Sequence, residues 1–219
     1  LEFHDACKEL GLQPLLGLTA HIARSSTRVA PGTLSLIAMD AAGWASLCQI
    51  SSLAQTRPDR DIEHGVPLSC ILTHSHGLLC LADVQDLAWD APPEGPAWLT
   101  MLHETYDDRL YLCLDQRVSA PTAQAARGTA QLRGLPLIGG HQVYYVEPEQ
   151  QDLQRTLAAI RVNQPRTALP PDELAPENSH LPSAAELWDR YADIDGLTDA
   201  DDVAARCTLS LPKGRQLFP

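Results

Sequence analysis

The stretch that most constrains this chain runs from Arg133 to Gln150 and reads RGLPLIGGHQVYYVEPEQ. It holds a short apolar strand, two glycines, a polar corner, a second apolar step and a Glu-Pro-Glu helix start. In a chain of alternating strands and helices, the residues just past the C-terminal end of a strand line the ligand crevice. His141, Gln142 and Tyr144 therefore mark the expected site, although an imidazole, an amide and a phenol without a carboxylate are a weak set for catalysis.

Apolar runs and amphipathic segments alternate along the chain, which indicates an α/β domain. The runs expected as strands are 12–22, 33–40, 77–84, 110–115 and 135–138, and the segments expected as helices are 2–10, 41–55, 97–106, 121–133, 148–162, 183–194 and 197–207. Loops are expected at 23–32, 56–67 and 91–96, and prolines make 163–182 irregular. The alternation favours mainly parallel strands, and it suits an open doubly wound sheet as well as a barrel.

Composition limits the classes of function. The chain has 219 residues, of which 44% are hydrophobic, and a net charge of −12. Nucleic-acid-binding domains are usually basic, so this acidity argues against direct duplex binding by the chain alone. No apolar run approaches the roughly 20 residues of a membrane span. No signal peptide is visible either, and we expect a cytoplasmic location without membrane contact.

The six cysteines show no metal-binding or disulfide pattern. They lie at positions 7, 48, 70, 80, 113 and 207, and none belongs to a CxxC pair. All except Cys70 fall inside apolar helix or strand patterns. This distribution predicts reduced thiols in the core.

The first helix, 2–10, begins without an N-cap residue and has an apolar face of Phe3, Ala6, Cys7 and Leu10. A domain rarely begins in this way, so we expect that an N-terminal part of the domain is missing. Helix 41–55 has a similar face, formed by Trp44, Leu47, Cys48, Ile50 and Leu53. The segments KELGLQPLLGL and AQLRGLPLIGG also echo each other, each with a helix end, a Gly-Leu step and a Pro-containing apolar strand.

The order and spacing of these motifs resemble the PHP domain (polymerase and histidinol phosphatase) of bacterial DNA polymerase III alpha subunits. EFHDACKELGLQPLLG is similar to that family's helix and Gly-Ile-Lys-Pro-Ile-Ile-Gly step, and DRLYLCLDQR to its Asp-Arg-Tyr-Tyr-Leu-Glu-Leu-Gln-Arg-His strand. PLIGGHQVYY resembles its Pro-Leu-Val-Ala-Thr-Asn-Asp-Val-His-Tyr segment. The resemblance covers nearly the whole chain. It implies a single PHP-like domain over 1–219, a distorted TIM-like (β/α)7 barrel without its first strands, with an irregular segment 163–182 and a helical part 183–207.

Active members of that family hold a metal cluster through His, Asp and Glu and hydrolyse phosphoesters. Metal ions neutralise phosphate charge and lower the pKa of a bound water. At the matching positions this chain has Thr19 for Glu, Gln142 for Asp and Tyr144 for His. Arg117 stands at another His position, or Val118 does if one residue is skipped. A hydroxyl, an amide, a phenol and a cation do not suit a metal cluster. The resemblance thus implies no metal, no cofactor and no catalytic residue.

Two histidine features could suggest a metal site. His74-Ser75-His76 imitates a His-x-His pair, but it precedes strand 77–84, where the family has polar residues that are not ligands. His141 lies beside the altered site and could hold an adventitious ion alone. A hydrogen-bonded polar histidine is the expected role.

The sequence therefore predicts a degenerate, metal-free PHP domain with a structural role in a DNA polymerase III alpha-type enzyme, replicative or error-prone. The chain is expected to be inactive by itself, and nucleotidyl transfer and DNA contact belong by resemblance to the parent polymerase. The implied partners are the palm and thumb domains. One alternative is an active metal-dependent phosphoesterase or 3′–5′ proofreading exonuclease, and another is a free-standing interaction module. Metal content and hydrolytic activity distinguish the first alternative from the preferred hypothesis.

Overall fold

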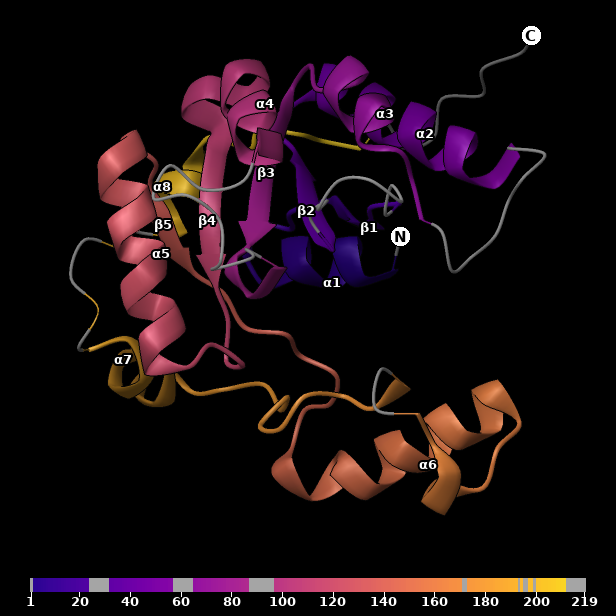
Figure 1. Ribbon diagram of the computed structural model, residues 1–219. Coiled ribbons are helices and arrows are strands. Elements are labelled where there is room, and N and C mark those ends of the chain that lie inside the picture. The colour runs from indigo at the N-terminus through magenta and orange to yellow at the C-terminus, as the bar shows by residue number, and fades with distance from the viewer. Residues whose placement is uncertain are drawn as a thin grey trace, which may run out of the picture.

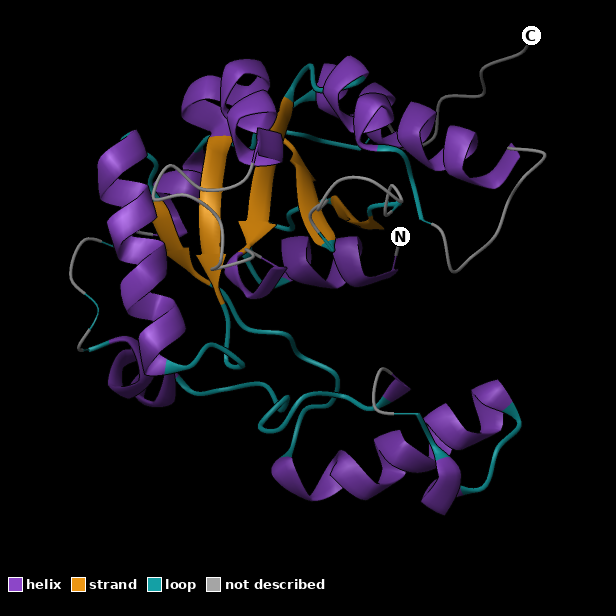
Figure 2. Ribbon diagram, in the orientation of Figure 1, coloured by secondary structure: helices purple, strands orange, loops and turns teal. Residues whose placement is uncertain are grey.

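A computed structural model describes residues 2–23, 32–56, 65–86, 97–170, 173–192, 194, 197–198 and 200–211. Within these residues there are five strands in one sheet and eight α-helices (Figures 1 and 2). The strands stand in chain order: β1 (Gly17–His21), β2 (Thr33–Ala38), β3 (Leu78–Asp83), β4 (Leu110–Leu114) and β5 (Leu137–Gly139). This confirms the α/β class. Of the expected loops 23–32, 56–67 and 91–96, the parts 24–31 and 57–64 and the whole of 91–96 lie outside the described residues.

The sheet is mixed. β1 and β3 run antiparallel to β2, whereas β3, β4 and β5 are parallel. The prediction of mainly parallel strands is thus wrong for the first half of the sheet. The chain leaves β2 and enters β3 at the same end of these two strands, where the Met39 amide donates to the Gly77 carbonyl at 2.9 Å. Only glycines allow this approach, because a Cβ on Gly43 would lie 2.0 Å from the Gly77 oxygen. The expected seven-stranded barrel stays a prediction.

The helices follow the sequence patterns closely, with one addition. They are α1 (Glu2–Glu9), α2 (Ala41–Thr56), α3 (Leu68–Thr73), α4 (Ala97–Tyr106), α5 (Ala120–Arg133), α6 (Gln151–Val162), α7 (Ala184–Tyr191) and α8 (Ala200–Ala205). The short helix α3 was not expected. None of the helices in the described ranges is long and apolar enough to cross a bilayer. The two echoing corners are alike: the Leu12 amide bonds the Cys7 carbonyl at 2.8 Å, and the Leu135 amide bonds the Ala130 carbonyl at 2.9 Å.

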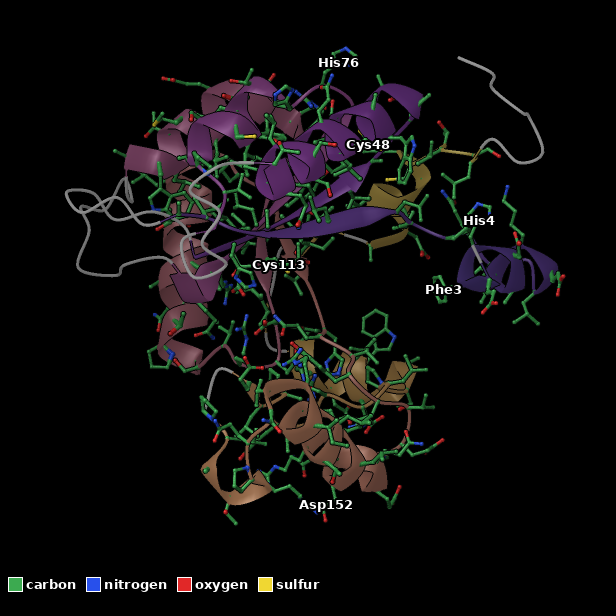
Figure 3. The ribbon with its side chains drawn as sticks, turned by 90° about the vertical axis from the view of Figure 1, so that its right-hand side faces the viewer. Phe3, His4, Cys48, His76, Cys113 and Asp152 are labelled. Carbon is green, nitrogen blue, oxygen red and sulfur yellow. The ribbon has the colours of Figure 1, made fainter. Side chains whose placement is uncertain are left out.

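One face of the sheet carries the main core. Alternate side chains of β2, β3 and β4 point to this face and pack against helices α2 to α5. The fully buried members include Leu34, Leu36, Cys80, Leu112, Ile50, Ile71, Leu102 and Tyr106. Figure 3 views the sheet nearly edge-on, with Cys48 of α2 above it and Cys113 of β4 below it. Burial of this apolar surface supplies most of the stability of the domain.

The opposite face of the sheet carries a much smaller apolar cluster than the first face. The strand register pairs His21 with Thr33 and Asp83 with Cys113, and the neighbouring pair Leu34–Ala82 places these two pairs side by side across four strands. A small cluster of Leu79, Tyr111, Ile138, Val203 and Cys207 closes one part of this face. The two residue pairs lie at the end of the sheet where the parallel strands terminate, so this face and this edge position the site.

Several expected helix and strand faces differ from those in the structure. Helix α1 buries His4 and Cys7, while Phe3 is 73% exposed. Helix α2 turns Gly43, Ser46, Leu47 and Ile50 inward and leaves Cys48 exposed. Apolar residues surround much of α2, and its inner face includes Gly43, which approaches Gly77 closely, as well as Leu47 and Ile50 of the core. The run 12–22 forms the shorter strand β1, which is mostly exposed because β1 is an edge strand.

The described part of 141–182 forms a lobe apart from the sheet body (Figure 1). Two chain segments connect it to the body and bond each other: the Tyr144 amide donates to the Ser179 carbonyl at 2.8 Å, and the Leu181 amide donates to the Tyr145 carbonyl at 3.0 Å. Helix α6 lies at the far end and buries only Ala158 and Ala159. The lobe therefore has little apolar core of its own.

Candidate functional site

An open cavity of about 1150 Å³ lies where β3, β4 and β5 end, on the thinly covered face of the sheet. All four positions that the sequence singled out, Thr19, Arg117, Gln142 and Tyr144, line this cavity. They come from β1, from the turn after β4 and from the segment after β5. The fold thus brings together residues that are far apart in the chain.

The wall formed by β1 and β2 is made of hydroxyl and imidazole groups. The Thr19 and Ser35 side-chain oxygens lie 3.5 Å apart, and the Thr33 hydroxyl lies 3.4 Å from His21 Nδ1. Sequence reasoning identified Thr19 but missed His21, Thr33 and Ser35. Their signal is weak, because it consists of polar side chains alternating with buried ones on an edge strand and its neighbour.

An ion network forms the centre of the cavity. Arg117 Nε donates to Asp115 Oδ2 at 2.8 Å, the Arg117 amide donates to Asp115 Oδ1 at 2.8 Å, and Arg117 Nη2 bonds Asp83 Oδ2. The side chains of Asp115, Asp83 and Arg117 are 5%, 14% and 37% exposed. Burial lowers the pKa of Arg117, but its hydrogen bond to Asp115 and the charge of Asp83 outweigh this and raise it above its usual value. The guanidinium is therefore permanently charged.

The two aspartates were missed by the sequence analysis, although a signal was present. Asp83 ends the run LLCLAD and Asp115 ends the run LYLCLD, so each follows a buried strand directly. Since β3 and β4 are parallel neighbours, their C-terminal ends lie at one edge. The same rule that selected His141 and Gln142 also selects these carboxylates.

Gln116 fastens the segment after β5 to the sheet. Its Oε1 accepts from the Gln142 amide at 3.0 Å, and its Nε2 donates to the Gln142 carbonyl at 3.0 Å and to Ser179 Oγ at 3.2 Å. The Gln142 side chain in turn donates to Asp115 Oδ2 at 3.1 Å. The Gln142 side chain is thus bonded to one of the two carboxylates of the ion network. Tyr144, which is 54% exposed, lies further along the same segment.

Both ring nitrogens of His141 have partners. Nε2 lies 2.9 Å from the His180 carbonyl and must carry the proton, which leaves Nδ1 as the acceptor for the Arg190 guanidinium. Burial lowers the pKa of His141, and the charge of Arg190 lowers it further, against the raising effect of the bond to His180. His141 is therefore held in its neutral form. This arrangement confirms the expected hydrogen-bonded polar histidine.

The His74-Ser75-His76 segment lies away from the cavity, in the turn that precedes β3. His74 Nδ1 is 2.9 Å from Gln49 Oε1, and Arg109 donates to the carbonyls of Ser75 and Leu78 at 2.7 and 2.9 Å. These bonds hold the turn in place, and the Arg109 guanidinium carbon also lies 5.3 Å from the centre of the Tyr106 ring. The position in a turn before the strand is as expected.

The side chains at the cavity do not fit a metal cluster. Across the described ranges, no three His, Cys, Asp or Glu side chains converge as ligands would. Burial, together with the charges of Asp83 and Asp115, raises the pKa of the Cys113 thiol to about 12, so this group stays protonated. The two carboxylates already bond Arg117. The lining also includes the imidazoles of His21 and His141 and the carboxylate of Glu177, but both nitrogens of His141 already have partners. The other lining groups are mainly hydroxyls, amides and a phenol, which are weak ligands in their neutral forms.

A comparison with known families identifies the type of domain. The model of the PHP domain matches residues 1–116, more than half of the chain. The chain belongs to the PHP domain family. The matched part contains β1 to β4 and ends at Gln116, directly before Arg117.

The chain is also similar to DNA polymerases over its whole length. It is 27% identical over 238 residues to the DNA polymerase III subunit alpha of Caulobacter vibrioides and 24% identical over 270 residues to that of Chlamydia trachomatis, covering 100% of the chain and 20% and 21% of these relatives. It is 23% identical over 228 residues to the error-prone DNA polymerase of Rhodopirellula baltica, covering 97% of the chain and 19% of that relative. The chain thus spans about a fifth of the length of the curated relatives it matches.

Proposed function

We propose that this chain is a degenerate, metal-free PHP domain with a structural role in a DNA polymerase III alpha-type polymerase. The observation that carries the proposal is the Arg117 guanidinium, which bonds both carboxylates at the cavity. A cation fixed between two aspartates prevents them from serving as metal ligands. Arg117 also stands at a position where the resemblance expects a histidine ligand, unless one residue is skipped and Val118 takes that position.

The other three altered positions support the same proposal. The Thr19 hydroxyl lies near the Ser35 hydroxyl, and the side-chain amide of Gln142 donates to the Asp115 carboxylate. Tyr144 presents a half-exposed phenol, which is a weaker metal ligand than the histidine that the resemblance expects. We therefore propose that Thr19, Arg117, Gln142 and Tyr144 are former ligand positions that no longer coordinate a metal.

The charge of the cavity also disfavours a phosphoester substrate. The ionisable groups that line it include the carboxylates of Asp83, Asp115 and Glu177 and the guanidinium of Arg117. A phosphate entering without metal ions would meet an excess of negative charge. In low dielectric such repulsion is large, and a hydrolytic site needs the opposite charge at this place.

The structural role concerns the parent polymerase. We propose that residues 1–219 act as one PHP-like domain, with the irregular part 163–182 and the helical part 183–207 included, and that it packs on the palm and thumb domains of a cytoplasmic polymerase. Among the described strands β1 is the outermost one, and we propose that further strands of a (β/α)7 barrel would add at this edge. Polymerase activity and DNA contact would then belong to other parts of that polymerase.

Two measurements on the purified 219-residue chain test this proposal. Elemental analysis after incubation with Zn²⁺ or Mn²⁺ and dialysis should find no stoichiometric metal. Incubation with a 3′-labelled primer or a phosphatase substrate, with or without these ions, should release no product above background. The variant His141→Ala serves as the control and should match the parent. Two or more metals per chain, or metal-dependent cleavage that His141→Ala abolishes, would show that an active phosphoesterase site has been rebuilt.

A further inference from the structure

Two carboxylates end neighbouring parallel strands on the same face of the sheet. Asp83 is the last residue of β3 and pairs in register with Cys113 of β4, and Asp115 follows β4 directly. Both carboxylates are largely shielded from water, at 14% and 5% exposure. Two like charges so placed destabilise the folded state unless a cation neutralises them.

The chain supplies that cation itself. Arg117 contacts Asp115 through its Nε, at 2.8 Å, and through Nη2, at 2.5 Å, and the same Nη2 also reaches Asp83. A single nitrogen thus lies between one oxygen of each carboxylate, as a bound metal ion would. The planar, multiply donating guanidinium suits this geometry, whereas a lysine ammonium on its flexible stem could not reproduce the set of bonds.

We infer that Arg117 is the resident cation of this cavity: it takes the electrostatic place of a metal ion, neutralises Asp83 and Asp115, and joins the ends of β3 and β4. The inference rests on the proposed metal-free state and adds a role for the residue that replaces a ligand. It differs from an ordinary surface ion pair, which contributes little, because Asp115 is almost fully buried.

The same cation also positions the lobe. Asp115 accepts from Arg117 and from the Gln142 side chain, and Gln142 begins the segment that leads out to α6. When the guanidinium is removed, Asp115 is left charged and loses its main partner. The hydrogen bonds of Gln142 should then weaken. The backbone amide of Gln142 donates to Gln116, so faster hydrogen exchange at this amide measures the weakening directly.

The test compares Arg117→Met with Asp83→Asn/Arg117→Met. Arg117→Met should lower Tm by roughly 5–10 °C, because the almost fully buried Asp115 and the shielded Asp83 both lose their ion pair with Arg117. The double variant should recover a large part of that loss, since it removes one negative charge. The asparagine side-chain oxygen that Asp83→Asn introduces can still accept from the Gln85 amide, as the Asp83 carboxylate does at 2.9 Å.

Two further variants complete this comparison. Arg117→Lys should fall between the wild type and Arg117→Met, because it keeps the charge but not the bonds of the guanidinium. Arg166→Met is the matched control, because the pair of Arg166 with Asp152 is 48% and 77% exposed, and its Tm should change by about 1 °C or less.

Addition of Mn²⁺ alone provides a second readout. In Arg117→Ala, millimolar Mn²⁺ should raise Tm, and in the wild type it should not. The inference fails if Arg117→Met keeps the wild-type Tm. It also fails if the double variant is no more stable than Arg117→Met, and this includes the case in which both variants are unfolded. These outcomes are distinct from failure of the proposed function, which would appear as metal bound to the wild-type protein.

Discussion

The central strands of the sheet body and helix α6 of the lobe place their leucines in opposite settings. Leu112 of β4 has no exposed surface and lies in the core beneath α4 and α5, whereas Leu157 of α6 is 58% exposed. In α6, Leu153, Leu157 and Ile160 recur at helical spacing and remain 56%, 58% and 70% exposed. The body is therefore stabilised by burial of apolar surface, and the lobe by hydrogen bonds that fasten it to the body. Substitutions in the two regions should therefore lower the free energy of unfolding by different amounts.

The largest effect is expected from Leu112→Ala in the sheet body. Truncation of a fully buried leucine removes transfer free energy and leaves a cavity, so the free energy of unfolding should fall by about 2–5 kcal/mol. Urea unfolding followed by circular dichroism measures it. A loss below about 1 kcal/mol would mean that the core around β4 collapses to fill the space.

A smaller effect is expected at the junction between body and lobe. The Tyr191 hydroxyl of α7 donates to the Leu114 carbonyl at 2.9 Å and also lies at the Gly140 carbonyl, where the chain leaves β5. Its ring packs so closely that a Cβ on Gly139 would lie 3.1 Å from it. Tyr191→Phe should cost about 0.5–1.5 kcal/mol in unfolding experiments. The control Tyr144→Phe, at an exposed phenol, should be neutral, and equal losses in both variants would contradict this assignment.

The third prediction concerns pH and the attachment of the lobe through His141. Burial and the charge of Arg190 hold the pKa of His141 below its usual 6.5, so the folded state favours the neutral ring. Unfolding releases this constraint, the unfolded chain binds the proton more readily, and stability therefore falls as pH drops below about 6.5. Among the facing groups, the charges of Arg190 and His180 add to the effect of burial, whereas the hydrogen bond to the His180 carbonyl and the charge of Asp115 oppose it.

Thermal melts between about pH 7.5 and pH 5.5 measure the effect. The variant His141→Gln should show a weaker decline over this range than the wild type, because glutamine does not titrate. Glu186 does not interfere here, because its hydrogen bonds to Ser183 and His180 lower its pKa to about 2. Identical slopes for both proteins would show that His141 is not the group responsible.

The smallest effect is expected from Leu157→Ala on the lobe. The side chain is largely exposed and both residues favour helices, so the free energy of unfolding should stay within about 0.5 kcal/mol of the wild type. The matched change Ala159→Leu on the same helix replaces a residue that is only 7% exposed and should cost about 1–3 kcal/mol through overpacking. A loss above about 2 kcal/mol in Leu157→Ala would indicate that another surface covers this helix face in solution.

Local patterns in the sequence determined the elements and their ends. The helix expected at 121–133 has Ser119 as its N-cap residue, and it ends at Gly134, which has a left-handed backbone conformation. Helix α7 begins with a capping box between Ser183 and Glu186. Such signals involve residues three or four positions apart, so they can be read without the fold. The rule that polar residues follow strand ends likewise located His141 and Gln142, which line the cavity.

The tertiary structure alone decided strand direction, the inner faces of α1 and α2, and the pairing of Arg117 with Asp83. Arg117 and Asp83 are 34 positions apart, and their contact depends on the parallel register of β3 and β4. Periodicity describes which side of an element is apolar, but it carries no information about which strand lies beside which. The altered residue Arg117 could thus be found in the sequence, whereas its role as a cation between two carboxylates follows only from the arrangement of the sheet.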